Sequence, residues 1–153
     1  MNNREILNSI LRELSARLGK RLGELNADGV VGFNYRDHVA VTIECPPDGR
    51  TAYLYADFGH MSNLRRERFC YKLLVANYLG QGTGNACFGI NDSENSLVLW
   101  TGFEVAALDA LEFESMLDNF LQVASLWDEQ FRGNEEVHLA VTDSPLELIG
   151  IRI

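Results

Sequence analysis

The stretch "YKLLVANYLGQGTGNACFGIND", residues 71–92, decides the fold, because it joins a helical pattern to a strand pattern through three glycines. Gly80, Gly82 and Gly84 form G-x-G-x-G, which resembles the glycine spacing of phosphate-binding loops. Such loops need the order strand, glycines, helix, so that the helix N-terminus faces the anion. Here a helix precedes the glycines, and its carbonyl end repels anions. The glycines therefore predict a helix cap and a tight turn, and not a nucleotide site.

The helix of this stretch is expected to span residues 64–79, "LRRERFCYKLLVANYL". Its apolar residues are spread over much of the helical circumference and do not form one narrow stripe. A helix of this kind needs two partners. One partner is the protein's own sheet, and the other could be a second subunit.

A first helix is predicted near the N-terminus, where Asn2 and Glu5 form a capping-box pattern and Gly19 and Gly23 supply the stop. Its apolar residues recur at helical spacing. They are Ile6, Leu7, Ile10, Leu11, Leu14 and Leu18.

A last helix is predicted to begin at a second capping box, Asp109 with Glu112, and to end at Gly133. One face of this helix is apolar. That face consists of Phe113, Met116, Leu117, Phe120, Ala124, Trp127 and Phe131.

Between the helices, apolar residues alternate with a period of two, which indicates strands. Three strands are expected from Val30 to Phe58, with turns at "RDH" and "CPPDGR", and two more in "NACFGIN" and "SLVLWTGF". The third strand places Ala52, Leu54, Ala56 and Phe58 on one face and Tyr53 and Tyr55 on the other.

These elements predict an α+β fold in the order α-β-β-β-α-β-β-α, with an antiparallel sheet of five or six strands and three helices. Residues 1–132 are expected to form the main domain. Residues 133–153 would add an extended arm or edge strands, because a tail ending in Ile149, Ile151 and Ile153 is too apolar to remain in solvent.

The net charge of −9 and the pI of about 4.7 argue against nucleic acid and anionic membranes as partners, because the field of the protein repels both. No signal peptide or apolar run of membrane-spanning length is apparent, so we expect a cytoplasmic protein. An acidic surface would suit a basic partner segment.

The sequence contains no pattern that indicates catalysis, a metal or a cofactor. Three cysteines at wide spacing, Cys45, Cys70 and Cys87, argue against a disulfide framework, and three scattered histidines argue against a metal site. His60 could converge with Cys70 and Cys87, but buried structural cysteine is the simpler interpretation. No serine lies in a G-x-S-x-G elbow. We therefore expect a protein that is not an enzyme.

In its element order, small size and acidity, the chain resembles the class I chaperones of bacterial type III secretion, the family of the Tir chaperone. The resemblance covers residues 4–131. "KLLVAN" is similar to the family's Leu-Leu-x-x-Asn at the end of its second helix, and "CFGIN" and "SLVLWTGF" continue the pattern. The motifs are patterns of apolar residues and not catalytic signatures.

The resemblance implies a homodimer whose second helix and fourth strand form the two-fold interface. It also implies a site on the first helix and the sheet for an extended N-terminal segment of a secreted effector, held without ATP. Ordinary core packing is the alternative for every residue assigned to these two surfaces. The dimer residues would be Phe69, Leu73, Leu74, Tyr78, Cys87 and Phe88. The client-binding residues would be Leu7, Leu14, Phe33, Tyr35, Val41, Ile43, Tyr53 and Tyr55.

The chain ends in an apolar-Gly-apolar-Arg-apolar pattern, residues 149–153. This ending is similar to those of secretion chaperones that also capture an anti-activator and so couple secretion to transcription. A regulatory adaptor that sequesters such a protein is therefore the second hypothesis. A third, a small enzyme, would need a pocket with convergent polar groups, for which the sequence offers no support. The co-purifying polypeptide would distinguish the first two hypotheses.

Overall fold

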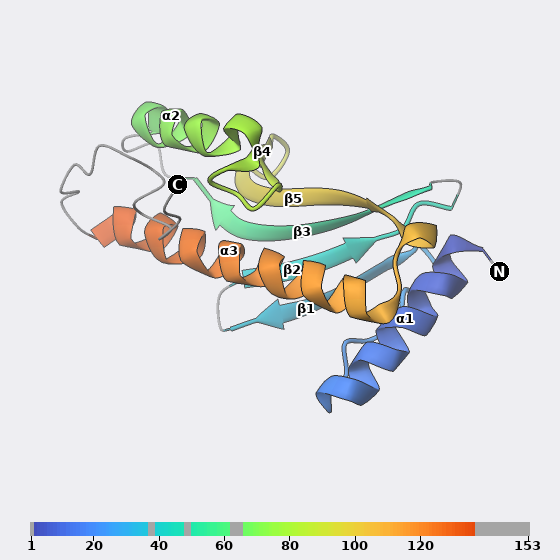
Figure 1. Cartoon of the computed structure of the whole chain (residues 1–153). Coiled ribbons are helices and arrows are strands. Elements are labelled where there is room, and N and C mark those ends of the chain that lie inside the picture. The colour runs from blue at the N-terminus through green and yellow to red at the C-terminus, as the bar shows by residue number, and fades with distance from the viewer. Residues whose placement is uncertain (1, 37–38, 48–49, 62–65, 137–153) are drawn as a thin grey trace.

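The computed structural model describes residues 2–36, 39–47, 50–61 and 66–136, and it confirms the predicted α+β order (Figure 1). The described part of the chain contains three α-helices and one sheet of five strands. In chain order the elements are α1 Asn3–Leu18, β1 Val30–Tyr35, β2 Val39–Glu44, β3 Thr51–His60, α2 Arg66–Asn77, η1 Tyr78–Gly80, β4 Cys87–Asn91, β5 Ser96–Glu104, η2 Val105–Ala107 and α3 Ala110–Glu136. The arm predicted after residue 136 lies outside the described residues.

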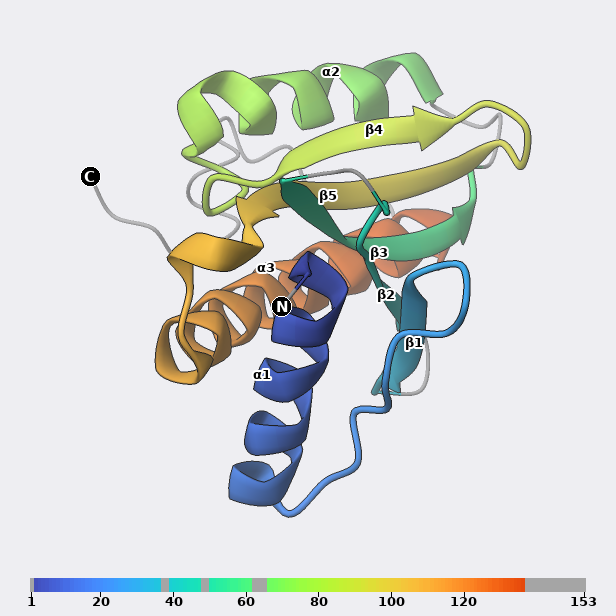
Figure 2. The same ribbon diagram turned by 90° about the vertical axis from the view of Figure 1, so that its right-hand side faces the viewer.

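The sheet is antiparallel throughout, in the strand order β1-β2-β3-β5-β4. Helices α1 and α3 cover one face, and α2 runs beside the β4 edge (Figure 2). Because side chains alternate along a strand, every second residue of β3 faces the helices. Ala52, Leu54 and Ala56 are on this covered side and are fully buried. None of the described helices lies over the opposite face of the sheet, which carries Tyr53 and Tyr55, as predicted.

Helix α1 begins with the predicted capping box: Asn2 Oδ1 accepts a hydrogen bond from Glu5 N at 2.9 Å, and Asn2 N donates to Glu5 Oε2 at 2.9 Å. The helix ends at Gly19, which has a left-handed φ of 62°. Its apolar stripe enters the core, except that Leu18 is exposed. The stripe residues that are buried are Leu7, Ile10, Leu11 and Leu14.

Arg4 attaches the start of α1 to the sheet. Its guanidinium donates to three backbone oxygens, those of Cys45 at 2.8 Å, Ala27 at 2.9 Å and Asp28 at 2.7 Å. Only glycine fits at position 29, because a Cβ there would collide with both the Arg4 guanidinium and the Cys45 carbonyl. Burial raises the pKa of the Cys45 thiol, partly offset by the nearby Arg4 charge, so this cysteine is a structural residue.

Helix α3 also begins with its predicted capping box, in which Asp109 Oδ1 accepts from Glu112 N at 2.9 Å and Asp109 N donates to Glu112 Oε2 at 3.0 Å. The prediction that Gly133 ends this helix is wrong, because α3 continues to Glu136. Glycine in a helix costs only about 1 kcal/mol relative to alanine, and nothing crowds Gly133, so the preceding turns carry the helix through it. None of the helices within the described residues is long and apolar enough to cross a membrane.

Candidate protein-interaction surfaces

Half of the predicted client-binding residues lie in the protein's own core. Leu7 and Leu14 of α1 and Ile43 of β2 have no solvent-exposed area, and Val41 is nearly as buried. They belong to the core that α1, α3 and the covered face of the sheet enclose together. In this conformation they hold the helical layer and the sheet together, and a client could contact them only if the covering helices moved.

Phe33 and Tyr35 lie on β1, an edge strand that pairs only with β2 within the described residues. Both side chains are half-buried against the core. The Arg36 guanidinium lies 5.7 Å from the centre of the Tyr35 ring, within cation–π range. These two aromatic residues therefore flank a sheet edge whose backbone groups have no strand partner in the described part of the chain.

Tyr53, Tyr55 and Trp100 form what we call the aromatic face, on the side of the sheet that no helix within the described residues covers. Tyr55 lies opposite Trp100 across β3 and β5, and the rings of Tyr53 and Trp100 are 6.3 Å apart. Burial raises the pKa of the Tyr55 hydroxyl, and the Glu44 carboxylate raises it further. Trp100 was missed as a site residue, although the alternation Leu97, Leu99 already placed it on the opposite side from the core.

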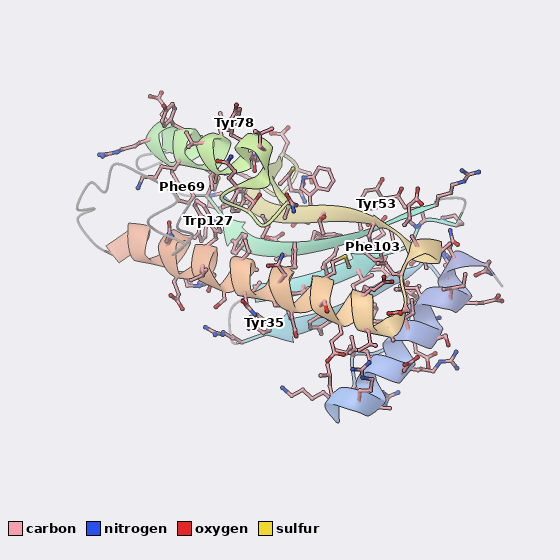
Figure 3. All side chains as sticks on the ribbon, in the orientation of Figure 1. Tyr35, Tyr53, Phe69, Tyr78, Phe103 and Trp127 are labelled. Atoms are coloured by element: carbon pink, nitrogen blue, oxygen red, sulfur yellow. The ribbon has the colours of Figure 1, made fainter. Side chains whose placement is uncertain are left out.

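The predicted dimer residues separate into buried and exposed sets. Leu73 and Phe88 are buried, and Phe69 packs on Phe131 of α3 with their ring centres 6.0 Å apart. Cys87 of β4 lies opposite Trp100 and is half-buried. Leu74 and Tyr78 are largely exposed. Figure 3 shows Phe69 and Trp127 between α2 and α3, with Tyr78 on the far side of α2.

Leu74 and Tyr78 belong to a continuous apolar surface, here called the α2 stripe, which consists of Tyr71, Leu74, Val75, Tyr78 and Leu79. The first four occur at spacing i, i+3, i+4, i+7 and so share one helix face. Tyr71, Leu74, Tyr78 and Leu79 are each 67–72% exposed. Sequence reasoning found two of the five, because a helix that is apolar around much of its circumference does not reveal which face meets its own sheet.

Leu79 has a backbone conformation that is unusual for its side chain. Its φ of 52° lies in the left-handed region, within the short η1 helix that follows α2. For a residue with a Cβ this conformation costs roughly 1–2 kcal/mol. A left-handed residue is common just after a helix, but it is usually glycine, so Leu79 combines an unfavourable backbone conformation with a side chain that is 72% exposed.

Asn77, the last residue of the Leu-Leu-x-x-Asn pattern, attaches α2 to the edge of the sheet. Its side chain accepts a hydrogen bond from Phe88 N at 2.7 Å and donates one to Phe88 O at 3.2 Å. The carboxamide thereby satisfies a backbone donor and acceptor on β4, as a neighbouring strand would. These two bonds fix the position of α2, and of its stripe, relative to the sheet.

The glycine loop packs against the last helix and does not form an anion site. The Trp127 indole donates to Gly82 O at 2.9 Å, and a Cβ at Gly82 would lie only 2.8 Å from Ala76 Cα. Gly84 has a φ of 59°, and its carbonyl faces Asn119 of α3. The prediction of a turn is correct, but the first left-handed residue after α2 is Leu79 and not a glycine.

Two charged side chains at one end of the sheet, Asp57 and Arg132, are engaged in structural bonds. A depression at the end of β3 is lined in part by Asp57, His60 and Arg132. Asp57 Oδ1 accepts from Gly59 N at 2.7 Å and its Oδ2 from Ser96 Oγ at 2.9 Å, while Arg132 pairs with Asp128 at 2.9 Å. Within the described residues no three potential metal ligands are brought together.

Comparison with known proteins places this geometry in a family. The sequence model of the Tir chaperone protein (CesT) family matches residues 9–128. A search of curated protein sequences finds no significant match.

Solved structures with this fold include three complexes of relatives. The ExsC–ExsE complex contains a chain that superposes with a TM-score of 0.73 at 21% identity, covering 86% of this chain and 97% of the other. A chain of the HopA1–SchA chaperone–effector complex superposes with a TM-score of 0.65 at 13% identity, covering 84% of this chain and 94% of the other. A chain of the ExoU–SpcU complex of Pseudomonas aeruginosa superposes with a TM-score of 0.59 at 17% identity, covering 78% of this chain and 92% of the other.

At these identities the structural likeness shows the fold, whereas the family model matches most of the sequence. The match includes the Leu-Leu-x-x-Asn pattern, the glycine loop, and strands β4 and β5. The chain belongs to the Tir chaperone protein (CesT) family.

Proposed function

We propose that this chain, a type III secretion chaperone by its family, binds an extended segment near the N-terminus of a secreted effector. It keeps that segment soluble and ready for secretion in the bacterial cytoplasm, and it uses no ATP. The family is one of chaperones and not of enzymes, so on that ground the prediction of a non-enzymatic role is confirmed.

The observation that carries the proposal is a closed core beside two apolar surfaces that the described part of the chain leaves uncovered. The core already uses the inward residues of α1, α3 and all five strands. The α2 stripe remains exposed, as do Tyr53 and Trp100 of the aromatic face, whereas Tyr55 is half-buried. Clustered exposed apolar side chains of this kind mark sites of protein contact in soluble proteins. Two separate surfaces suit two contacts, one with a second copy and one with a client.

The α2 stripe is the surface we assign to the dimer. It can pack against the same stripe of a second copy about a two-fold axis, which is the commonest arrangement of homodimers. Leu74 and Tyr78 supply direct contacts in this proposal. Other predicted residues contribute indirectly, because they pack α2 against the rest of the protein. They are Leu73, Phe69 and Phe88. Ile90 on β4 is also exposed and could extend the contact.

The client surface we propose combines the β1 edge with the two faces of the sheet. An extended segment can add to β1 as a further strand, with main-chain hydrogen bonds providing affinity. Phe33 and Tyr35 on β1 then lie beside the added strand. Tyr53 and Tyr55 lie two strands away on β3, and a continuation of the client segment across the other face of the sheet contacts them. Ordering a disordered client costs about 2–5 kcal/mol, so the client must cover a large surface to bind tightly.

Affinity capture from the native cell tests the proposal. The tagged full-length chain is purified and its partners are identified by mass spectrometry, followed by limited proteolysis of the complex. We expect a secreted effector whose protected segment lies near its N-terminus and is unfolded when free. Protection of a folded domain, or of a segment far from the N-terminus, would contradict the proposal.

A second candidate is a regulatory adaptor that sequesters an anti-activator on the same surfaces. It is favoured by the apolar ending "LIGIRI", residues 148–153, which resembles endings of chaperones with that role. In this hypothesis the tail pairs with a sheet edge or with the partner subunit, and the bound protein displaces or extends it. A chain lacking residues 137–153 should then differ in dimerisation or client affinity, and unchanged values of both would rule the hypothesis out.

A further inference from the structure

The five strands carry an unusual set of charges. None of them contains a lysine or an arginine, and their acidic residues are Glu44, Asp57 and Glu104. The register places all three carboxylates on the uncovered side of the sheet, the side of the aromatic face. That side therefore combines exposed aromatic rings with negative charge, and no cation from a strand offsets it.

The acidic and aromatic groups are direct neighbours. Glu44 lies opposite Tyr53, and Asp57 follows Tyr55 by two residues on the same side of β3. Cross-strand neighbours in an antiparallel sheet have Cβ atoms roughly 4.5–5.5 Å apart, within reach of a single bound side chain. Two glycines lie beneath the rings: a Cβ at Gly102 would lie 3.5 Å from Tyr53 Cε1, and a Cβ at Gly89 would lie 3.6 Å from Trp100 Nε1.

We propose that the aromatic face selects client segments in which an arginine or lysine is flanked by apolar residues. The cationic head would lie over the Tyr53 or Trp100 ring and within reach of the Glu44 carboxylate. Aromatic rings attract cations through their negative faces, and a carboxylate at the rim adds to this attraction. This inference rests on the proposed chaperone function and specifies the chemistry of its client.

Charge also argues against the other possible occupants of this face. Two copies packed through it about a two-fold axis would bring Glu44, Asp57 and Glu104 of each copy toward those of the other. Like charges facing each other oppose association. An acidic segment would be repelled for the same reason. The α2 stripe contains no charged residue and remains the surface assigned to the second copy.

The chain carries its own reporter for this face. It has two tryptophans, of which Trp100 is 40% exposed and Trp127 is 1% exposed. Quenching of tryptophan fluorescence by acrylamide therefore reports mainly on Trp100. The probe is the peptide acetyl-Gly-Leu-Arg-Leu-Arg-Leu-Gly-amide, and the matched control replaces each arginine with citrulline, which is similar in shape but uncharged.

We expect the arginine peptide to protect Trp100 from acrylamide and the citrulline peptide to bind about threefold or more weakly. The variant Glu44→Gln should lower the affinity for the arginine peptide by a similar factor and leave that for the citrulline peptide unchanged. The control Asp118→Asn removes one charge from an exposed position on α3 and should change neither affinity. Added salt should reduce the difference between the two peptides.

Three outcomes would overturn the inference. These are equal binding of the two peptides, no protection by the arginine peptide, and protection of Trp100 that grows with protein concentration alone, which would assign the face to a second copy. The client captured from the native cell separates a failure of this inference from a failure of the proposed function. A client that binds while Trp100 stays accessible and Glu44→Gln is neutral contradicts this inference alone, whereas capture of no secreted client contradicts the proposed function.

Discussion

Helices α1 and α2 are both rich in apolar residues, yet the protein uses them differently. The inward face of α1 is buried in the core, with Leu7, Leu11 and Leu14 fully covered. Helix α2 buries only Leu73 and Ala76 and leaves a row of large apolar side chains in solvent. The comparison teaches that apolar content alone does not identify core residues. In α1 it stabilises the monomer, and in α2 most of it is available for a partner.

The largest expected effect is on stability, from truncating a core residue of α1. Leu11→Ala should destabilise the protein by about 2–5 kcal/mol, because the lost methyl groups leave a cavity that the packed core cannot close. Chemical denaturation measures the loss, which should not depend on protein concentration. The matched change Leu74→Ala should have an effect only at concentrations where the dimer forms. Equal, concentration-independent losses in both variants would remove the distinction between the two helices.

The next effect is on assembly. Leu74→Glu should weaken the dimer at least about 100-fold, roughly 2.7 kcal/mol, because it places two charges in an apolar two-fold contact. Sedimentation velocity over a concentration series measures the change, and circular dichroism checks that the monomer is still folded. Leu111→Glu, at an exposed leucine of α3, is the control and should leave assembly unaltered. A monomeric unmodified protein, or a dimer insensitive to Leu74→Glu, would count against the assignment.

Leu73 and Phe88 are not suitable for this test. Both are buried, so glutamate at either position would unfold the chain and would not report on the dimer.

The bond between α2 and the sheet should have a smaller effect. Asn77→Ala removes two hydrogen bonds and leaves the Phe88 backbone groups unpaired, at a cost of roughly 1–3 kcal/mol. Because these bonds orient the α2 stripe, the dimer should weaken as well. Asn77→Asp keeps the acceptor for Phe88 N but loses the donor to Phe88 O, so its stability should lie between those of the alanine variant and the unmodified chain. An alanine variant as stable as the unmodified protein would show that other contacts hold α2.

The smallest effect concerns the strained residue of the stripe. Leu79→Gly should raise the stability of the dissociated monomer by up to about 1 kcal/mol, since glycine adopts positive φ without a Cβ clash. The same change should weaken the dimer, because it removes an exposed apolar contact. Thermal unfolding at low concentration and sedimentation at high concentration separate the two effects. If the stability of the monomer and the strength of the dimer both decrease, Leu79 has a role within the monomer.

Much of the fold could be predicted from local chemistry. The capping boxes at Asn2 and Asp109 mark helix starts that the structure confirms, and the period-two pattern of β3 correctly separates Ala52 from Tyr53. The end of α3 could not be placed, because a single glycine near the last turn is a weak stop. The family was also indicated by residues 71–92, where Leu73 is a core residue, Leu74 lies in the stripe and Asn77 binds the edge strand.

The proposed surfaces were less predictable. Leu7, Leu14, Val41 and Ile43 were named as client contacts, but in the structure they are buried in the protein's own core. Trp100 and Tyr71 were passed over although both are exposed. Hydrophobic periodicity shows that a residue has an apolar neighbour, but it does not show whether that neighbour belongs to the same chain.

The sequence by itself determined the order of the elements, their caps, the acidity of the surface and the likeness to secretion chaperones. These properties depend on residues close together in the chain or on composition. Only the tertiary structure decided which side of α2 is buried, that Asn77 completes the edge of β4, and that every charge on the strands lies on the uncovered face. Those properties depend on which strands pair and on where the helices pack, and contacts between distant segments set both.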